Sequence, residues 1–106
     1  MFTEIYEDNA GFIHAIIRHG DNIINVITGL EQDDIPYNEF INAARWGFED
    51  ADEYDPDEYG GKSMEDVANE ITSCFDPVAE ITSDHIELHL SRMGLAAKRL
   101  FCIDVD

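Results

Sequence analysis

The N-terminal third of the chain alternates with a period of two, and this pattern constrains the fold more than any other feature. Apolar and β-branched side chains recur at every second position between residues 12 and 19, and the alternation returns at residues 23–27. The breaks fall at residues 7–11 and at residues 19–22, and the second break has a Gly-Asp pair at its centre, as a tight hairpin turn prefers. We therefore expect three antiparallel strands between residues 2 and 30, joined as a meander.

The pattern changes to helical spacing after residue 35. Asp33 and Asp34 stand just before Pro36, and carboxylates followed by proline are favoured where a helix begins, because the amides of its first turn are unpaired. Apolar side chains then recur at helical spacing as far as Phe48. This predicts a helix over residues 36–48.

A second helix is expected from Ser63 to the residue before Asp76-Pro77. Ser63 and Asp66 resemble a capping box in which aspartate replaces the usual glutamate. An apolar face follows, formed by Met64, Val67, Ala68, Ile71 and Phe75.

The C-terminal third predicts a hairpin, formed by residues 78–82 and 86–90 around Ser83-Asp84, with Glu87 and His89 on one face of its second strand. Residues 91–101 suit a short helix that Gly94 weakens by roughly 1 kcal/mol. Residues 102–105 are compatible with a last short strand.

Together these elements predict a single acidic α+β domain over residues 1–106. Its antiparallel sheet consists of the N-terminal three-stranded meander and the C-terminal hairpin, covered by two or three helices, which we expect on one face. The length leaves room for one core. A hydrophobic content of 44% is typical of a folded chain, not of a disordered one.

Several classes of protein are excluded. No apolar run approaches the roughly 20 residues that span a bilayer, so we expect no membrane association. The segment Met1 to Glu7 holds two acids where a secretory signal would have basic residues. We therefore expect the protein to be located in the cytoplasm, which is the cytoplasm of the host cell if the protein is phage-encoded. Cys74 and Cys102 lack a CxxC partner and are expected to be buried free thiols.

Acidic side chains are concentrated in the middle of the chain. The formal net charge is −18, and residues 49–58 contain seven carboxylates without a basic residue. Residues 31–70 hold 14 acids against Arg45 and Lys62, whereas half of the positive charge lies near the C-terminus. Such a charge repels nucleic acid, so we expect no direct nucleic-acid binding. Because crowded like charges oppose the compact state, the cluster favours a strongly basic partner that relieves the repulsion.

The acidic segment is also compatible with a plain solvated loop or with a metal site. The twelve residues from Asp55 to Asp66 partly match a calcium-binding EF-hand loop, but Tyr59 stands where a short oxygen ligand is needed and Asp66 is shorter than the usual glutamate. His85 and His89 have the spacing of a zinc pair. No nucleophile motif or phosphate-binding loop is present. We expect no enzyme, no cofactor and no catalytic or metal-binding residue.

Carboxylates on a folded surface can imitate DNA, which presents about one phosphate charge per 1.7 Å of its axis. In size, charge and its dense acidic segments, Asp33 to Glu39 and Glu49 to Glu58, the chain resembles the small DNA-mimic inhibitors of phages and mobile elements, including anti-CRISPR and anti-restriction proteins. Trp46 is expected either in the core or as an aromatic anchor, and the two tyrosines of the segment either beneath the loop or at the interface.

The resemblance implies an acidic inhibitor that occupies the nucleic-acid-binding surface of a basic protein, such as a Cas effector or restriction enzyme. The nearest alternative is an immunity protein or antitoxin that neutralises a cognate nuclease toxin, and a less favoured one is a small cation-binding protein. The oligomeric state stays open, with a homodimer as one alternative. The residues expected to contact the partner are Asp33, Asp34, Glu39, Glu49, Asp50, Asp52, Glu53, Tyr54, Asp55, Asp57, Glu58 and Tyr59.

Overall fold

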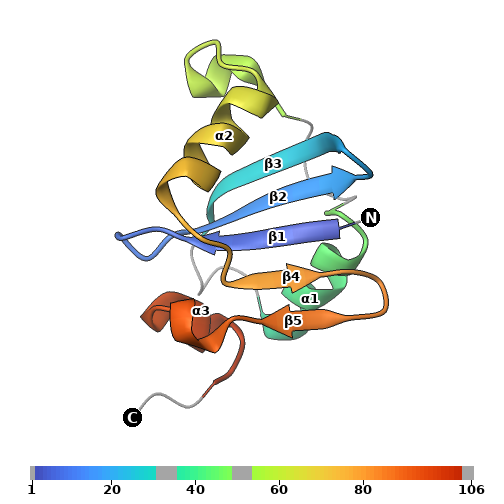
Figure 1. Cartoon of the computed structure of the whole chain (residues 1–106), viewed down its shortest axis with the longest axis vertical. Helices are drawn as coiled ribbons and strands as arrows, with labels where there is room; N and C mark the ends of the chain where they lie inside the picture. The colour runs from blue at the N-terminus through green and yellow to red at the C-terminus, as the bar shows by residue number, and fades with distance from the viewer. Residues whose placement is uncertain (1, 31–35, 49–53, 104–106) are drawn as a thin grey trace.

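Five strands form one antiparallel sheet in the spatial order β3-β2-β1-β4-β5 (Figure 1). The computed structural model describes residues 2–30, 36–48 and 54–103. Its elements in chain order are β1 (Phe2–Glu7), β2 (Ile13–His19), β3 (Asn22–Leu30), α1 (Tyr37–Arg45), η1 (Pro56–Tyr59), α2 (Met64–Cys74), β4 (Ala79–Ile81), β5 (Ile86–Leu88), η2 (Leu90–Arg92) and α3 (Leu95–Leu100), where η1 and η2 are short 3-10 helices. The predicted α+β fold, with the meander and the hairpin in one sheet, is confirmed.

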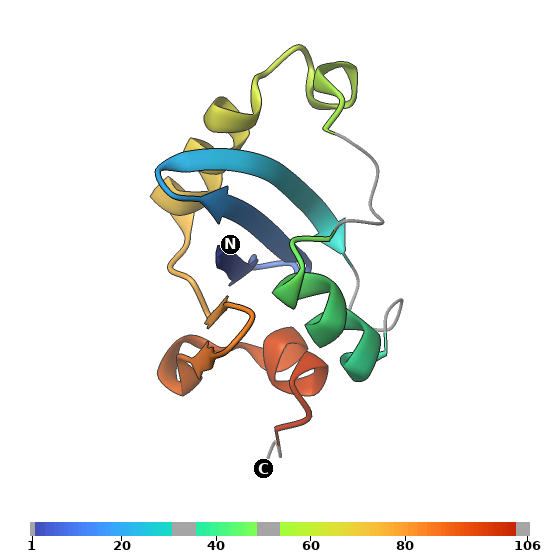
Figure 2. The same ribbon diagram turned by 90° about the vertical axis from the view of Figure 1, so that its right-hand side faces the viewer.

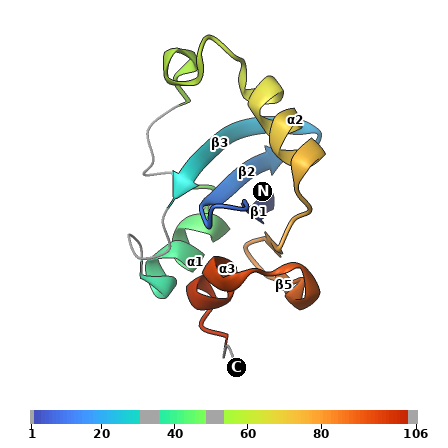
Figure 3. The same ribbon diagram turned by 90° about the vertical axis from the view of Figure 1, so that its left-hand side faces the viewer.

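The central strands bury side chains on both faces of the sheet. Ile5 and Ile17 are fully buried on one face, and Tyr6 and Ile16 are buried on the other. Because successive side chains of a strand point to opposite faces, both faces need cover. Figure 2 shows α2 on one side of the sheet and α1 with α3 on the other, and Figure 3 shows the same layers from the opposite side. The expectation that helices cover only one face was therefore wrong.

The larger core lies between the sheet and the pair α1 and α3. Phe40 is at its centre, in edge-to-face contact with Phe48 and with Phe101, each at a centroid distance of 5.9 Å. Such aromatic pairs add roughly 0.5–1.5 kcal/mol each beyond the area they bury. The buried Thr3 hydroxyl donates to the Ala44 carbonyl at 2.8 Å and so fixes α1 against β1.

The second core lies between α2 and the meander, where Val67, Ala68 and Ile71 pack near Tyr6 and Ile16. The structure confirms the predicted start of this helix, because the Ser63 hydroxyl accepts a hydrogen bond of 3.2 Å from the Asp66 amide. It ends at Cys74, just before the predicted boundary.

The first helix, α1, is shorter than predicted at its C-terminal end. Pro36 occupies the N-cap position and the helix ends at Arg45. Gly47 then takes a φ of 69° and Phe48 a φ of 56°, a left-handed turn that glycine adopts readily. This turn directs Phe48 back into the core while its amide donates to the Ala43 carbonyl at 2.7 Å.

Three details of the C-terminal third differ from the sequence expectations. Gly94 does not interrupt a helix but stands at the N-cap of α3. Cys102, with a φ of 56°, and Ile103 form no strand, and residues 104–106 lie outside the described residues. Both cysteines are exposed free thiols, not buried ones, because Val67, Ala68 and Ile71 form the buried stripe of α2 and Cys102 lies in the turn that follows α3.

Glu7, the last residue of β1, joins the sheet to α3. Its carboxylate accepts the amide of Gly94 at 2.6 Å and the amide of Ala96 at 2.9 Å, two donors that a helix start leaves unpaired. A Cβ at position 94 would lie 2.7 Å from Glu7 Oε1, so a larger residue there would displace the carboxylate from its present position. None of the helices in the described segments has the length and apolar character needed to cross a bilayer.

We expect Glu7→Ala to lower the free energy of unfolding by about 1–2 kcal/mol, because it leaves two amides without their acceptor. Urea denaturation followed by circular dichroism measures the change. Glu58→Ala is the matched control, since it removes the same charge from an exposed side chain and should change stability by less than about 0.5 kcal/mol. Equal stability of the two variants would contradict this role of Glu7.

Candidate functional site

The structure divides the acids predicted to contact a partner into three groups. Asp33, Asp34, Glu49, Asp50, Asp52 and Glu53 lie outside the described residues. Glu39 is exposed on α1, whereas Asp55, Asp57 and Glu58 are exposed at η1. Figures 2 and 3 show η1 at one end of the long axis, beyond β3, and α1 against the sheet face opposite α2. The structure therefore does not bring Glu39 together with the acids of η1.

A dense group of carboxylates is formed instead around η1 and along the first two turns of α2. We call it the acidic end, and its members are Asp55, Asp57, Glu58, Glu65, Asp66 and Glu70, all of them exposed. Glu65 and Asp66 lie in the first turn of α2, where the unpaired amides and the helix dipole favour negative charge. The sequence pattern predicted the first three of these acids as contact residues and missed the three on α2.

Only one basic residue of the described chain lies within this segment. The Lys62 ammonium contacts Glu70 at 2.6 Å, and this hydrogen bond, together with the negative charge of Glu70, raises the pKa of Lys62 above its ordinary value. Both side chains are about half exposed, so the pair contributes little to stability. The acidic end therefore keeps most of its negative charge.

Tyr54 and Tyr59 hold η1 against the second core. Their rings stack at a centroid distance of 4.8 Å with an interplanar angle of 13°. The Tyr54 hydroxyl donates to the Lys62 carbonyl at 2.6 Å, and the Tyr59 hydroxyl shares a hydrogen bond of 2.9 Å with the Thr28 hydroxyl. Both tyrosines are half-buried against the second core. They position the carboxylates of η1.

The segment 55–66 does not form an EF-hand loop. Asp55 caps η1 by accepting the Asp57 amide at 3.0 Å, and Ser63 caps α2. Among the described residues, the group of metal-ligand side chains that comes together is Glu80, Glu87 and His89, not any set within this segment.

Three of the basic residues lie at the opposite end of the molecule. Arg92, Lys98 and Arg99 lie on η2 and α3, at the other end of the long axis from η1 (Figure 1). The charge asymmetry of the sequence is therefore also an asymmetry in space, within the described residues.

Trp46, at the C-terminal end of α1, is 54% exposed, which excludes the first of its two alternatives, packing in the core. Its role as an aromatic anchor stays a prediction.

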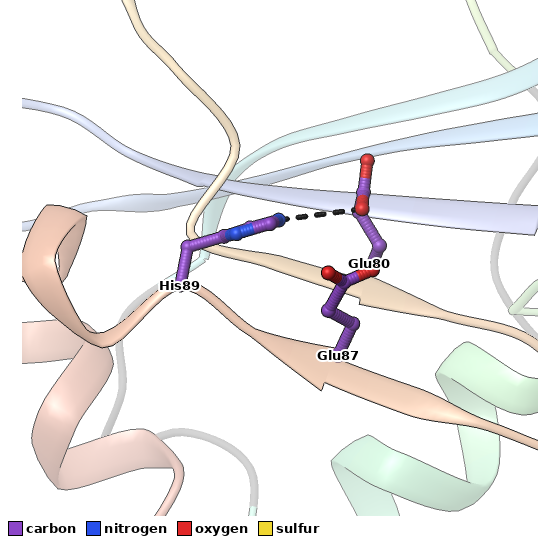
Figure 4. Close-up of side chains that lie close together, drawn as sticks. All are labelled: Glu80, Glu87 and His89. Carbon is purple, nitrogen blue, oxygen red and sulfur yellow. Dashed lines mark hydrogen bonds and ion pairs between the residues drawn. The ribbon is translucent and has the colours of Figure 1, made fainter.

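A second acidic feature crosses the sheet on the face that α2 covers only in part. The register places Glu4 opposite Glu80 and Glu80 opposite Glu87, so three carboxylates form one row across β1, β4 and β5. Glu4 is paired with Arg18 at 2.6 Å. His89 Nε2 lies 3.3 Å from a carboxylate oxygen of Glu80, with Glu87 beside them (Figure 4).

Sequence reasoning placed Glu87 and His89 on one face but did not find this row. Its other two carboxylates, Glu80 and Glu4, come from β4 and β1, and their alignment depends on the pairing of these two strands. A search for glutamates that pair across the predicted hairpin could have found Glu80 opposite Glu87, but nothing local indicates that Glu4 is their neighbour.

Tyr6 lies between this row and the second core. Burial raises the pKa of its hydroxyl above the usual range, and the neighbouring Glu4 and Glu80 carboxylates raise it further, against the opposing charge of Arg18. The hydroxyl is therefore neutral in the folded protein at neutral pH.

No family model, curated protein or solved structure matches the chain. Its function is therefore inferred from its own residues and their geometry.

Because the pKa of Tyr6 is raised by folding, its contribution to stability is complete below the unfolded pKa of about 10 and is lost as the pH rises above that value. We expect the free energy of unfolding of the wild type to fall more steeply between about pH 9 and 11 than that of Tyr6→Phe, by at most about 1.4 kcal/mol per pH unit. Urea denaturation at each pH measures both slopes. Parallel curves would contradict the neutral, buried hydroxyl.

Proposed function

We propose that the protein is an acidic inhibitor that docks its acidic end onto the basic, nucleic-acid-binding surface of another protein. The observation that supports this proposal best is the exposure of six carboxylates around η1 and along the first two turns of α2, with Lys62 as the basic residue of that segment. Lysine and arginine side chains that hold phosphates would accept such carboxylates in their place.

The way the acids are held also supports docking. Tyr54 and Tyr59 fix η1 to the second core, and Ser63 caps the start of α2, so these carboxylates stand on ordered elements. An ordered charge array loses less conformational entropy on binding than a flexible one. Their mutual repulsion favours a complex that neutralises them.

The separation of charge along the molecule gives the docking a direction. With Asp57 and Glu58 at one end and Lys98 and Arg99 at the other, a basic surface attracts the first end more strongly than the second. Such steering raises the association rate and falls as salt is added. An immunity protein or antitoxin would use the same surface against a single nuclease toxin, so the choice of target distinguishes the two functions.

DNA cleavage by an RNA-guided nuclease, by a restriction endonuclease and by nuclease toxins, each with the protein added, tests the proposal. We expect inhibition that excess duplex DNA relieves and that weakens steeply between about 50 and 200 mM salt. Inhibition limited to one cognate nuclease toxin would favour the immunity function. Absence of inhibition throughout, or inhibition that salt does not change, would contradict the proposal.

A triple variant locates the docking surface on the acidic end. Asp57→Asn, Glu58→Gln and Asp66→Asn together should weaken inhibition roughly tenfold, because three exposed charge contacts of about 0.5 kcal/mol each are lost. Asp55 is left intact because it caps η1.

The matched control is Asp21→Asn, Glu39→Gln and Asp84→Asn. It also removes two aspartate charges and one glutamate charge, but from exposed positions elsewhere in the fold. It should inhibit nearly as well as the wild type. If both triple variants lose inhibition equally, the net charge and not the acidic end determines binding.

A further inference from the structure

We propose that Glu80, Glu87 and His89 bind a divalent first-row transition metal such as Zn²⁺. Glu80 lies on β4, Glu87 on β5 and His89 directly after β5. One ligand atom from each residue lies within 4.8 Å of the others. The site lies at the β5 edge of the sheet, away from the acidic end, and so it is independent of the proposed docking function.

The register of the sheet brings like charges face to face here. Glu80 is the direct partner of Glu87 on one side and of Glu4 on the other. Like charges directly opposite each other in a sheet destabilise the pairing. The strands β4 and β5 contain only three residues each, so they have few other pairs to offset this cost.

The neighbouring cations neutralise only part of the row. The Arg18 guanidinium contacts Glu4 at 2.6 Å. His89 reaches Glu80 at 3.3 Å, and among the described residues no ion pair involves Glu87. A divalent cation between Glu80 and Glu87 would neutralise both carboxylates at once.

The donor set points to a transition metal. Imidazole nitrogen with carboxylate oxygens suits zinc and its neighbours, whereas calcium and magnesium prefer oxygen ligands alone. Zinc sites with three protein ligands, among them histidine and glutamate, leave one position for water. The side chains of Glu80 and His89 are 27% and 24% exposed, so the group is accessible to an ion from solvent but shielded on the side of the sheet.

Little movement is required to form the site. Zinc bonds of roughly 2.0–2.2 Å place ligand atoms roughly 3–4 Å apart, and His89 Nε2 and Glu80 Oε2 are already within that range. Figure 4 shows the His89 ring directed toward Glu80, with the Glu87 side chain rising from the adjacent strand toward both. Glu87 is exposed, so rotation of its side chain can bring a carboxylate oxygen to the ion. The bound metal would join β5 to β4 through side chains.

Calorimetric titration with ZnCl₂ and thermal unfolding in ZnCl₂, CaCl₂ or MgCl₂ test the proposal. We expect saturable binding of one Zn²⁺ per chain and a Tm that rises with zinc concentration, because the metal binds the folded state. Calcium and magnesium should raise Tm much less. A Co²⁺ titration should give the absorption bands of a nitrogen- and oxygen-ligated ion.

The variant Glu80→Gln, Glu87→Gln, His89→Gln should weaken Zn²⁺ binding at least about tenfold and abolish the zinc-dependent rise in Tm. Glu87→Gln alone changes an exposed side chain and should also weaken binding, so the proposal stays testable if the triple variant does not fold. The matched control, Glu58→Gln, Glu65→Gln, His85→Gln, changes the same residue types at exposed positions and should bind zinc like the wild type.

Any of four results would overturn the proposal, and the first three concern the wild type and the site variants. These are the absence of saturable zinc binding by the wild type, binding that survives both Glu87→Gln and the triple variant, and calcium or magnesium effects as large as those of zinc. Equal loss in the matched control would also overturn it, since carboxylates in general would then hold the ion.

Discussion

The fold depends on the burial of both faces of the two central strands. Ile5 and Ile17 on one side and Tyr6 and Ile16 on the other must all leave water, so the sheet needs helices on both sides. The chain meets this requirement with α1 and α3 on one face and α2 on the other, and each helix supplies only a narrow apolar stripe. The charged side chains are consequently left on the outer sides of the helices, on η1, and on the part of the sheet face beyond α2.

Local sequence patterns predicted most of the helices and strands. The features that these patterns missed depend on contacts between segments that are distant in the sequence. The period-two alternation identified the meander, and the Ser63 cap identified the start of α2. The two-sided burial escaped prediction because His14 and Arg18 flank Ile16 and give that face of β2 a polar composition. The carboxylate row across β1, β4 and β5 escaped it because strand order is a tertiary property, and Gly94 was misplaced because its role depends on Glu7, 87 residues earlier.

The two acidic features differ in how the fold treats their charge. At the acidic end the carboxylates are exposed, and the surrounding water and salt partly screen their repulsion. In the sheet-face row, Glu4 and Glu80 are partly removed from water, and each has a specific neighbour, Arg18 or His89. Charges of the first kind suit recognition of an extended basic surface, and charges of the second kind suit a small ion held at short range. This difference is why we assign the two features to different ligands.

The central claim of the proposed function is that a basic surface binds at the acidic end. Residue-resolved NMR tests this claim most directly. A ¹⁵N-labelled sample titrated at low salt with a short arginine-rich peptide reports which amides respond to a cationic ligand. We predict that shift changes within the described chain concentrate in residues 55–70, with little change in α1 and α3. Changes of equal size over the whole molecule, or changes centred on α1 or α3, would contradict it.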